Sequence, residues 1–335
     1  MHARELLRPE AGGICCPLGG FHIDPGRPVE RAIVTHGHGD HCRSGHAALL
    51  ASPETAAIAR ARYGDGAFGT VETLGYGRPL RIGEVTVTLV PAGHVLGSAQ
   101  VVVEAGGSRA VVSGDYKRRA DPTCRPFELV PCDLFVTEAT FGLPVFRHPP
   151  VEDEIGRLLA SVRRFPERTH VIGAYALGKA QRLIAELRRA GWARPIWLHG
   201  ALTKLCETYE RIGVPLGSLE QATGALAGQL RGEIVLAPPG ALNERWVRRM
   251  PDPLPVAASG WMRVRQRAKQ RGVELALVVS DHADWDELTA TIRETGAGEV
   301  WVTHGAEEAL IHWCRMHGIP AQALHLVGRG DEDVE

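Results

Sequence analysis

The chain has 335 residues, 44% of them hydrophobic, which allows two modest domains or one larger domain with an insertion. Its formal net charge is −1, so bulk charge indicates no polyanionic partner, and any nucleic-acid surface has to be local. No apolar run approaches the about 20 residues of a membrane helix, and residues 1–20 lack the pattern of a signal peptide. Seven scattered cysteines without a Cys-x-x-Cys pair fit reduced thiols, so we expect a cytoplasmic globular protein.

The segment Thr35-His36-Gly37-His38-Gly39-Asp40-His41 brings three imidazoles and a carboxylate together in a short stretch of chain. A buried strand is predicted before it at Arg31–Val34, and an Ala/Leu-rich helix after it at Ser44–Ala61. Imidazole nitrogen and carboxylate oxygen suit a borderline divalent metal such as zinc. Chance clustering or helix capping would also place histidines here. The spacing favours a dinuclear metal site, with His36 and His38 as one pair and Asp40 and His41 as the other.

Further along the chain, predicted strands repeatedly lead into an acidic or imidazole side chain. Val85–Val90 precedes His94, and Arg109–Ser113 precedes Asp115. Three later segments do the same, namely Cys132–Thr137 before Glu138, Glu274–Val279 before His282, and Val300–Thr303 before His304. Structural carboxylates rarely repeat in this way, so we expect these side chains to meet at one edge of a sheet.

Asp24 follows a predicted strand just upstream of the histidine-rich segment. It could accept a hydrogen bond from a metal-ligating imidazole and so set the tautomer of that ring. An Asx-turn before Pro25 is an equally good explanation.

The pattern changes near residue 149. Helices at Val151–Arg164 and Lys179–Ala190 alternate with short apolar strands, which predicts a small α/β unit inserted into the first fold. We therefore expect a first domain segment at residues 1–148, an inserted domain at 149–255, and a return of the first domain at 256–335.

Two segments offer basic side chains for phosphate. Lys179 and Gln181 open a helix whose N-terminal amides could hold an anion, although an ordinary helix start explains them as well. Residues 263–271 carry the densest run of cations, which is either a solvated helix face or a phosphate-backbone contact. The cations of this run are Arg263, Arg265, Arg267, Lys269 and Arg271.

The order His-x-His-x-Asp-His at residues 36–41, followed by His94, Asp115 and His304, resembles the metallo-β-lactamase superfamily. The inserted unit, Glu138 and the segment around His282 resemble its β-CASP branch, which includes the Artemis repair nuclease and the polyadenylation endonuclease. The sequence motifs are most similar to those of bacterial ligase-associated DNA exonucleases. That likeness covers almost the whole chain and rests on Ile23-Asp24-Pro25, Val112–Lys117, Val136-Thr137-Glu138, Thr140–Pro144, Ser259–Met262 and Ser280–Trp285.

The resemblance implies an αββα sandwich with an inserted α/β β-CASP domain. It implies two divalent ions, zinc or alternatively manganese, one held by His36, His38 and His94, the other by Asp40, His41 and His304, with Asp115 bridging. Asp40, Glu138 and His282 would serve catalysis. Nucleic-acid contacts would come from Lys117, Lys179, Gln181, Ser259, Arg263, Arg265 and Arg267.

The implied activity is that of a DNA exonuclease in repair, working with a DNA ligase and a helicase and without a membrane partner. An RNA nuclease of the same chemistry is the nearest alternative, because no residue can be identified that reads the 2′-hydroxyl. Thioester or lactam hydrolases use the same metal motif. A non-catalytic module with a structural metal fits less well, because structural zinc usually has closed, cysteine-rich ligation.

Overall fold

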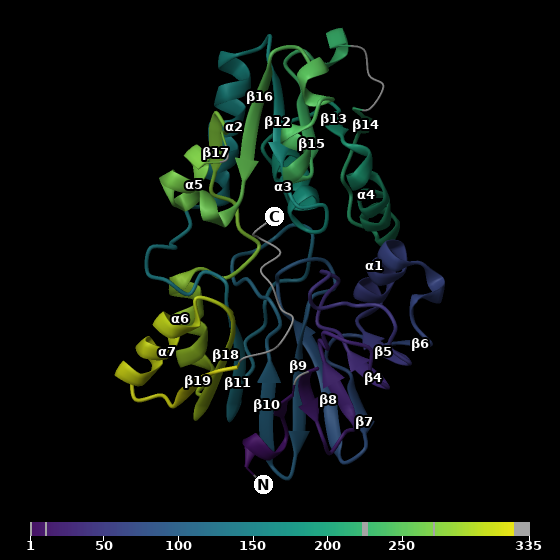
Figure 1. Cartoon of the computed structure of the whole chain (residues 1–335), viewed down its shortest axis with the longest axis vertical. Coiled ribbons are helices and arrows are strands. Elements are labelled where there is room, and N and C mark those ends of the chain that lie inside the picture. The colour runs from purple at the N-terminus through teal and green to yellow at the C-terminus, as the bar shows by residue number, and fades with distance from the viewer. Residues whose placement is uncertain (1, 11, 223–226, 271, 325–335) are drawn as a thin grey trace. The chain divides into compact units, whose positions relative to one another are not determined.

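The computed structural model describes residues 2–10, 12–222, 227–270 and 272–324, and the chain divides into two compact units. The first comprises Met1–Val145 and His282–Val334, and the second is Phe146–Asp281 (Figure 1). The sheets and helices below are described within each unit.

Two sheets build the first unit. One has the order β1 (Arg8–Glu10), β2 (Gly13–Cys16), β3 (Phe21–Ile23), β4 (Arg31–Ile33), β5 (Ala48–Ala51) and β6 (Thr70–Thr73). The other has the order β19 (Ala321–Ala323), β18 (Glu299–Gly305), β11 (Leu134–Ala139), β10 (Ser108–Val112), β9 (Ala99–Ala105), β8 (Val85–Pro91) and β7 (Pro79–Ile82).

The alternation of side chains along these strands sets the layers. In β8, Val85, Val87 and Leu89 are buried and the residues between them are partly exposed, as the period of two in a strand requires. Their buried face joins residues of the first sheet, such as Ile14 and Phe21, in one core between the two sheets.

Helices cover the outer faces of both sheets. α6 (Trp285–Thr295) and α7 (Glu307–Met316) pack with β11, β18 and β19 over a second core that includes Phe135 and Leu288 (Figure 1). On the first sheet, α1 (Pro53–Tyr63) lies over a smaller core. The first unit is therefore an αββα sandwich.

The second unit has one parallel sheet with the order β14 (Leu219–Gln221), β13 (Ile196–Leu198), β15 (Ile234–Ala237), β12 (Thr169–Gly173), β16 (Pro253–Ala258) and β17 (Leu275–Leu277). Its helices are α2 (Val151–Arg164), α3 (Lys179–Arg189), α4 (Gly200–Ile212) and α5 (Arg265–Gln270). Every residue of β12 is buried, as expected for a central strand of a parallel sheet.

The second unit extends further along the chain than residues 149–255. β16 pairs with β12, and β17 pairs with β16, so the chain up to Asp281 belongs to this sheet. The first unit resumes at His282 rather than at residue 256.

The helix predicted at Ser44–Ala61 is wrong in its first part. Residues 48–51 form β5, which pairs with β4 and β6 and buries Leu49 and Leu50. The helix α1 starts only at Pro53, where the hydroxyl of Ser52 accepts a hydrogen bond from the Thr55 amide at 3.1 Å. Among the described residues, no helix is long and apolar enough to cross a membrane.

Candidate metal centre

The candidate metal ligands lie at the ends of strands from both sheets of the first unit. His36 comes after β4, His94 after β8, and Asp115 after β10. Gly93 and Gly114, each directly before one of these ligands, have φ of 75° and 56°. A Cβ atom at Gly93 would lie 2.3 Å from the Lys117 carbonyl oxygen, so only glycine lets the chain turn His94 inward here.

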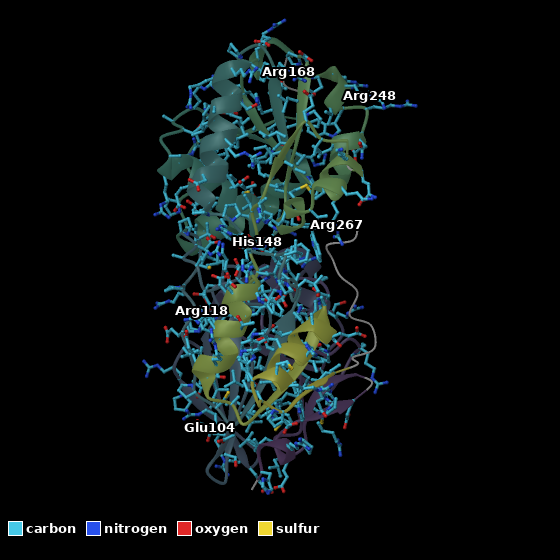
Figure 2. The ribbon with its side chains drawn as sticks, turned by 90° about the vertical axis from the view of Figure 1, so that its left-hand side faces the viewer. Glu104, Arg118, His148, Arg168, Arg248 and Arg267 are labelled. Carbon is cyan, nitrogen blue, oxygen red and sulfur yellow. The ribbon has the colours of Figure 1, made fainter. Side chains whose placement is uncertain are left out.

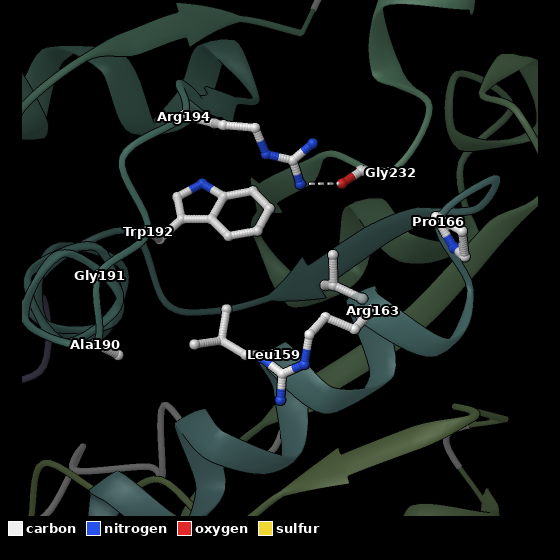
Figure 3. Close-up of a pocket in the computed structure, with 9 residues that line it drawn as sticks. Leu159, Arg163, Pro166, Ala190, Gly191, Trp192, Arg194 and Gly232 are labelled. Carbon is white, nitrogen blue, oxygen red and sulfur yellow. Dashed lines mark hydrogen bonds between the residues drawn. The ribbon is translucent and has the colours of Figure 1, made fainter.

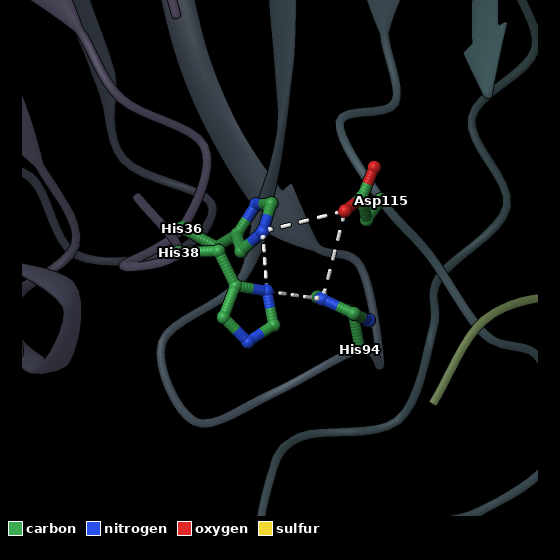
Figure 4. A group of neighbouring side chains, drawn as sticks. All are labelled: His36, His38, His94 and Asp115. Carbon is green, nitrogen blue, oxygen red and sulfur yellow. Dashed lines mark hydrogen bonds and ion pairs between the residues drawn. The ribbon is translucent and has the colours of Figure 1, made fainter. Parts of the chain in front are cut away.

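Four of these side chains converge on a common point (Figure 4). His38 Nδ1 lies 3.0 Å from both His36 Nε2 and His94 Nε2. Asp115 Oδ2 lies 3.4 Å from His36 Nε2 and 3.7 Å from His94 Nε2. Three imidazole nitrogens and one carboxylate oxygen thus face one another.

A second group lies beside the first and shares Asp115 with it. His41 Nε2 and His304 Nε2 each lie 3.2 Å from Asp40 Oδ2. Asp115 Oδ2 is also 3.4 Å from His41 Nε2, so one carboxylate oxygen contacts imidazoles of both groups. His304 has a φ of 70°, a left-handed conformation that is uncommon for histidine and marks a constrained position.

The donor set fits divalent metal ions. Two ligand atoms bound to one zinc ion at a tetrahedral angle, each at about 2.0–2.2 Å, lie about 3.3–3.6 Å apart. The nitrogen-to-oxygen separations of 3.2–3.4 Å among His36, His41, His304, Asp40 and Asp115 match that spacing closely.

The protonation states favour metal binding. Burial, with the neighbouring His41, holds the pKa of His36 well below its usual value, so that ring is neutral. Burial opposes ionisation of Asp115 and Asp40, but the neighbouring histidines together, His41 foremost, keep both pKa values well below normal. Burial also disfavours a charged His41, yet Asp115, Asp40 and Asp24 raise its pKa well above normal. A metal replaces that proton.

Asp24 contacts a candidate ligand directly. Its Oδ2 lies 2.8 Å from His41 Nδ1, which leaves His41 Nε2 directed at Asp40 and Asp115. Thr35 holds this carboxylate by donating from its amide at 2.7 Å and from its hydroxyl at 2.6 Å. The Thr35 hydroxyl also lies 3.1 Å from His36 Nδ1. Sequence reasoning did not give Thr35 a role, although its position directly before His36 was visible.

Glu138 and His282 form a pair beside these groups. His282 Nδ1 lies 3.0 Å from Glu138 Oε2, and the amide of Tyr116 donates to Glu138 Oε1 at 2.7 Å. Asp115 and this pair offer ligand atoms within 4.8 Å of one another. The rings of His282 and His94 have centroids 4.6 Å apart. The pair is therefore next to the shared carboxylate.

The residues expected to contact nucleic acid are dispersed and mostly engaged within the protein. Lys117, Lys179, Gln181 and Ser259 are buried. Gln181 Oε1 accepts from the Gly178 amide at 2.8 Å, Lys179 Nζ lies 3.4 Å from Asp281, and the Ser259 hydroxyl accepts from the Trp261 amide at 3.3 Å.

Two arginines of the basic run are exposed. Arg263 ends the 3₁₀ turn η6 (Gly260–Arg263). Arg267, labelled in Figure 2, is on α5. Its guanidinium lies over the ring of Trp261, 3.9 Å from the ring centroid. The side chain of Arg265 and the whole of Arg271 lie outside the described residues.

A pocket of about 360 Å³ lies within the second unit (Figure 3). Its wall includes Leu159 and Trp192, and the guanidinium of Arg194 lies 4.1 Å from the centroid of the Trp192 ring while donating to the Gly232 carbonyl at 2.7 Å. Its lining includes none of the predicted site residues, so this pocket is separate from the candidate metal centre.

Comparison with known proteins gives three informative relatives, while no family model matches the chain. A "Probable DNA ligase" of Opitutus terrae is 30% identical to this chain over 322 residues. The alignment covers 93% of this chain and 30% of that protein. The cleavage and polyadenylation specificity factor subunit 3 of Dictyostelium discoideum is 32% identical over 146 residues. That alignment covers 41% of this chain and 19% of that protein. The endoribonuclease YSH1 of Yarrowia lipolytica is 30% identical over 149 residues, and the alignment covers 42% of this chain and 18% of that protein.

The chain thus spans less than a third of the length of these curated relatives. Among solved structures, a protein of unknown function from Enterococcus faecalis shares the fold. Its TM-score is 0.55 with 14% sequence identity, covering 81% of this chain and 74% of that one.

The αββα sandwich with an inserted parallel α/β unit, and the His/Asp centre at its strand ends, define a metallo-β-lactamase fold. With the relatives above, the expected family is confirmed: the chain belongs to the β-CASP branch of the metallo-β-lactamase superfamily.

Proposed function

We propose that this protein is a metal-dependent phosphodiesterase that degrades DNA as an exonuclease. The observation that carries the proposal is the oxygen Asp115 Oδ2, which contacts imidazoles of two adjacent His/Asp groups with the Glu138–His282 pair beside it. Two adjacent cation sites with an acid–histidine pair suit the displacement of an alkoxide from phosphorus.

In this proposal His36, His38 and His94 hold one divalent ion, Asp40, His41 and His304 hold the other, and Asp115 is shared. When bound, such ions supply Lewis-acid stabilisation of charge on phosphate oxygens and lower the pKa of water. Asp24 and Thr35 set the orientation of His41 and His36 through the contacts described above.

The chain's own acid would be His282. Its Nδ1 lies 3.0 Å from Glu138 Oε2, so that nitrogen carries the proton shared with the carboxylate. A nearby carboxylate favours the charged imidazolium. His282 can then hold a proton at Nε2 and pass it to the leaving alkoxide. Glu138 is held in place for this task by the Tyr116 amide.

The choice of DNA over RNA rests on the extent of the likeness. The relative named as a DNA ligase aligns with 93% of the chain, whereas the two RNA-processing relatives align with 41% and 42%. That name also supports a partnership with a DNA ligase, to which we add a helicase, in DNA repair in the cytoplasm. RNA cleavage is the second candidate, because both of those relatives are named for RNA processing.

Exposed arginines are the proposed contacts to backbone phosphate. Arg263 and Arg267 are accessible, and Arg267 already stacks on Trp261, which favours a planar guanidinium in a fixed orientation. Lys117, Lys179, Gln181 and Ser259 would act from buried positions, by supporting the backbone around them.

The test is digestion of matched end-labelled DNA and RNA strands by metal-loaded protein. We expect stepwise loss of DNA, with zinc and manganese compared as the added metal. The His282→Ala variant should bind metal normally and lose about 10²–10⁴-fold in turnover, the usual contribution of a general acid. Metal content measured on the same samples separates loss of the acid from loss of the centre.

Each outcome has a distinct meaning. Degradation of RNA alone would overturn the DNA assignment and keep the phosphodiesterase chemistry. Full activity of His282→Ala would remove His282 from the reaction. Cleavage of neither strand, together with hydrolysis of a thioester substrate, would replace the nuclease with a hydrolase of another class.

A further inference from the structure

A separate set of metal-binding side chains lies on the outermost strands of the first sheet. The strand β2 pairs with β1 so that Cys15 faces Arg8, and with β3 so that Cys15 faces His22. Glu10 is two residues beyond Arg8 on β1 and therefore projects from the same face. Carboxylate, thiol and imidazole thus come from three adjacent strands.

This face is turned away from the core between the two sheets. The alternate residues of the same strands, including Ile14, Cys16, Phe21 and Ile23, belong to that core. Cys15 is only 8% exposed, whereas the side chains of His22 and Glu10 are 23% and 30% exposed. The Cys15 sulfur is shielded from solvent, but an ion can reach it past the partly exposed side chains of His22 and Glu10.

The geometry points to a zinc site formed by Glu10, Cys15 and His22. Their ligand atoms all lie within 4.8 Å of one another. His22 Nε2 and Glu10 Oε2 are 3.3 Å apart, which equals the edge of a tetrahedron around one zinc ion, about 3.3 Å for bonds of about 2.0 Å. Three protein ligands of these types leave a fourth position for water or another small ligand.

Arg8 is not a ligand of this site but holds one of its ligands in place. Its guanidinium donates to Glu10 Oε1 at 2.6 and 3.0 Å, while the other oxygen of that carboxylate, Oε2, faces His22. A ligating carboxylate is commonly oriented by such an outer hydrogen bond.

The bound ion would fasten the edge of the sheet. β1 has three residues and, within the part of the chain that the structure describes, pairs with β2 alone, so few backbone hydrogen bonds retain it. A metal joining β1, β2 and β3 would cross-link this edge without a disulfide.

Cobalt(II) titration of reduced, chelator-stripped protein tests the site. The candidate metal centre is built from imidazole and carboxylate donors, so a thiolate-to-cobalt charge-transfer band in the near ultraviolet reports on a cysteine ligand. We expect this band in the unmodified protein, its loss in Cys15→Ser, and its retention in the matched control Cys124→Ser. Elemental analysis should show one equivalent of metal less in Cys15→Ser.

A second pair of variants keeps the test decisive if Cys15→Ser fails to fold. Glu10→Gln and His22→Ala change partly exposed side chains and should weaken the cobalt site by at least about tenfold, since loss of even an outer partner costs about 10–100-fold. His317→Ala, at the residue that caps the C-terminus of α7, is the control. No band, a band that survives Cys15→Ser, or unchanged affinity in both Glu10→Gln and His22→Ala would overturn the proposal. None of these readouts depends on nuclease activity.

Discussion

At the scale of single residues, the centre depends on how each imidazole is oriented as much as on which donors are present. Asp24 accepts from the Thr35 amide and hydroxyl and lies 2.8 Å from His41 Nδ1, so His41 Nε2 is available for a cation. Asp24 itself has a φ of 45°, a conformation that aspartate and asparagine tolerate better than most residues.

The Asp24→Asn variant should therefore keep the backbone and lose the charge that orients His41. We expect metal affinity to fall about 10–100-fold, as is usual when the outer partner of a ligand is lost. Competition titration against a chromophoric chelator measures this. Asp252→Asn is the matched control, since Asp252 also has a positive φ, 35°, but its side chain is 69% exposed. Equal affinities for the two variants would contradict a role for Asp24.

At the scale of elements, the helix α6 anchors the segment that carries His282. Asp284 caps this helix, because its carboxylate accepts from the amides of Asp286 and Glu287, each at 3.1 Å. The Glu287 side chain in turn accepts from the Asp284 amide at 3.1 Å, which completes a capping box. Arg119 pairs with the same aspartate.

Removing this cap with Asp284→Ala should lower the free energy of unfolding by about 1–2 kcal/mol. It should also reduce turnover, because His282 lies two residues before Asp284 and the segment that positions it is loosened. Asp284→Asn keeps a capping oxygen and should retain most of the stability in denaturant melts. If Asn proved as damaging as Ala, the Arg119 ion pair rather than the cap would be the stabilising contact.

The central strand of the second unit contains a histidine whose titration should be visible in stability. Burial lowers the pKa of His170 to about 4 from an unfolded value of 6.5, and its Nε2 lies 2.9 Å from the Ser161 hydroxyl. Between these two pH values the unfolded chain binds the proton and the folded chain does not. Stability contributed by neutral His170 is therefore present above about pH 6.5 and is lost as the pH falls towards 4.

We expect a loss on the order of 2 kcal/mol at pH 4.5 relative to pH 7 from this residue. The measurement is the difference in denaturant stability between the unmodified protein and His170→Gln across this range. Parallel pH profiles for the two proteins would show that His170 does not titrate as described.

At the scale of the whole molecule, the two units should respond differently to metal. The donors of the centre all belong to the first unit, and four of its carboxylates, Asp24, Asp40, Asp115 and Glu138, are buried close together. Without cations, neighbouring carboxylates that remain ionised repel one another. Bound ions therefore contribute to folding of the first unit, by about 4 kcal/mol when free metal is 1,000 times Kd.

Chelation should lower the melting temperature of the first unit and leave that of the second unit in place. Calorimetry of stripped and zinc-reloaded protein measures both transitions, and reloading should restore the first. A uniform shift of all unfolding would mean that the units unfold together. No shift in either transition would contradict a contribution of metal to stability.

Local chemistry and strand pattern were sufficient to predict much of the candidate site and part of the fold. The spacing of His36 to His41, and the placement of His94, Asp115 and His304 after apolar runs, predicted side chains that the structure does bring together, although they come from the ends of strands in two sheets rather than from one sheet edge. The alternation in Val85–Val90 likewise predicted the strand that buries Val85, Val87 and Leu89. These features depend on residues near one another in the chain.

Only the tertiary structure decided the rest, because it depends on contacts between distant residues. Pairing of β16 and β17 with β12 assigns the chain up to Asp281 to the second unit, and pairing with β4 and β6 makes residues 48–51 a strand despite their helix-like composition. The hydrogen bonds from Thr35 to Asp24, and the alignment of Glu10, Cys15 and His22 across three strands, follow from register. The sequence determined which donors were present, and the pairing of strands determined which of them meet.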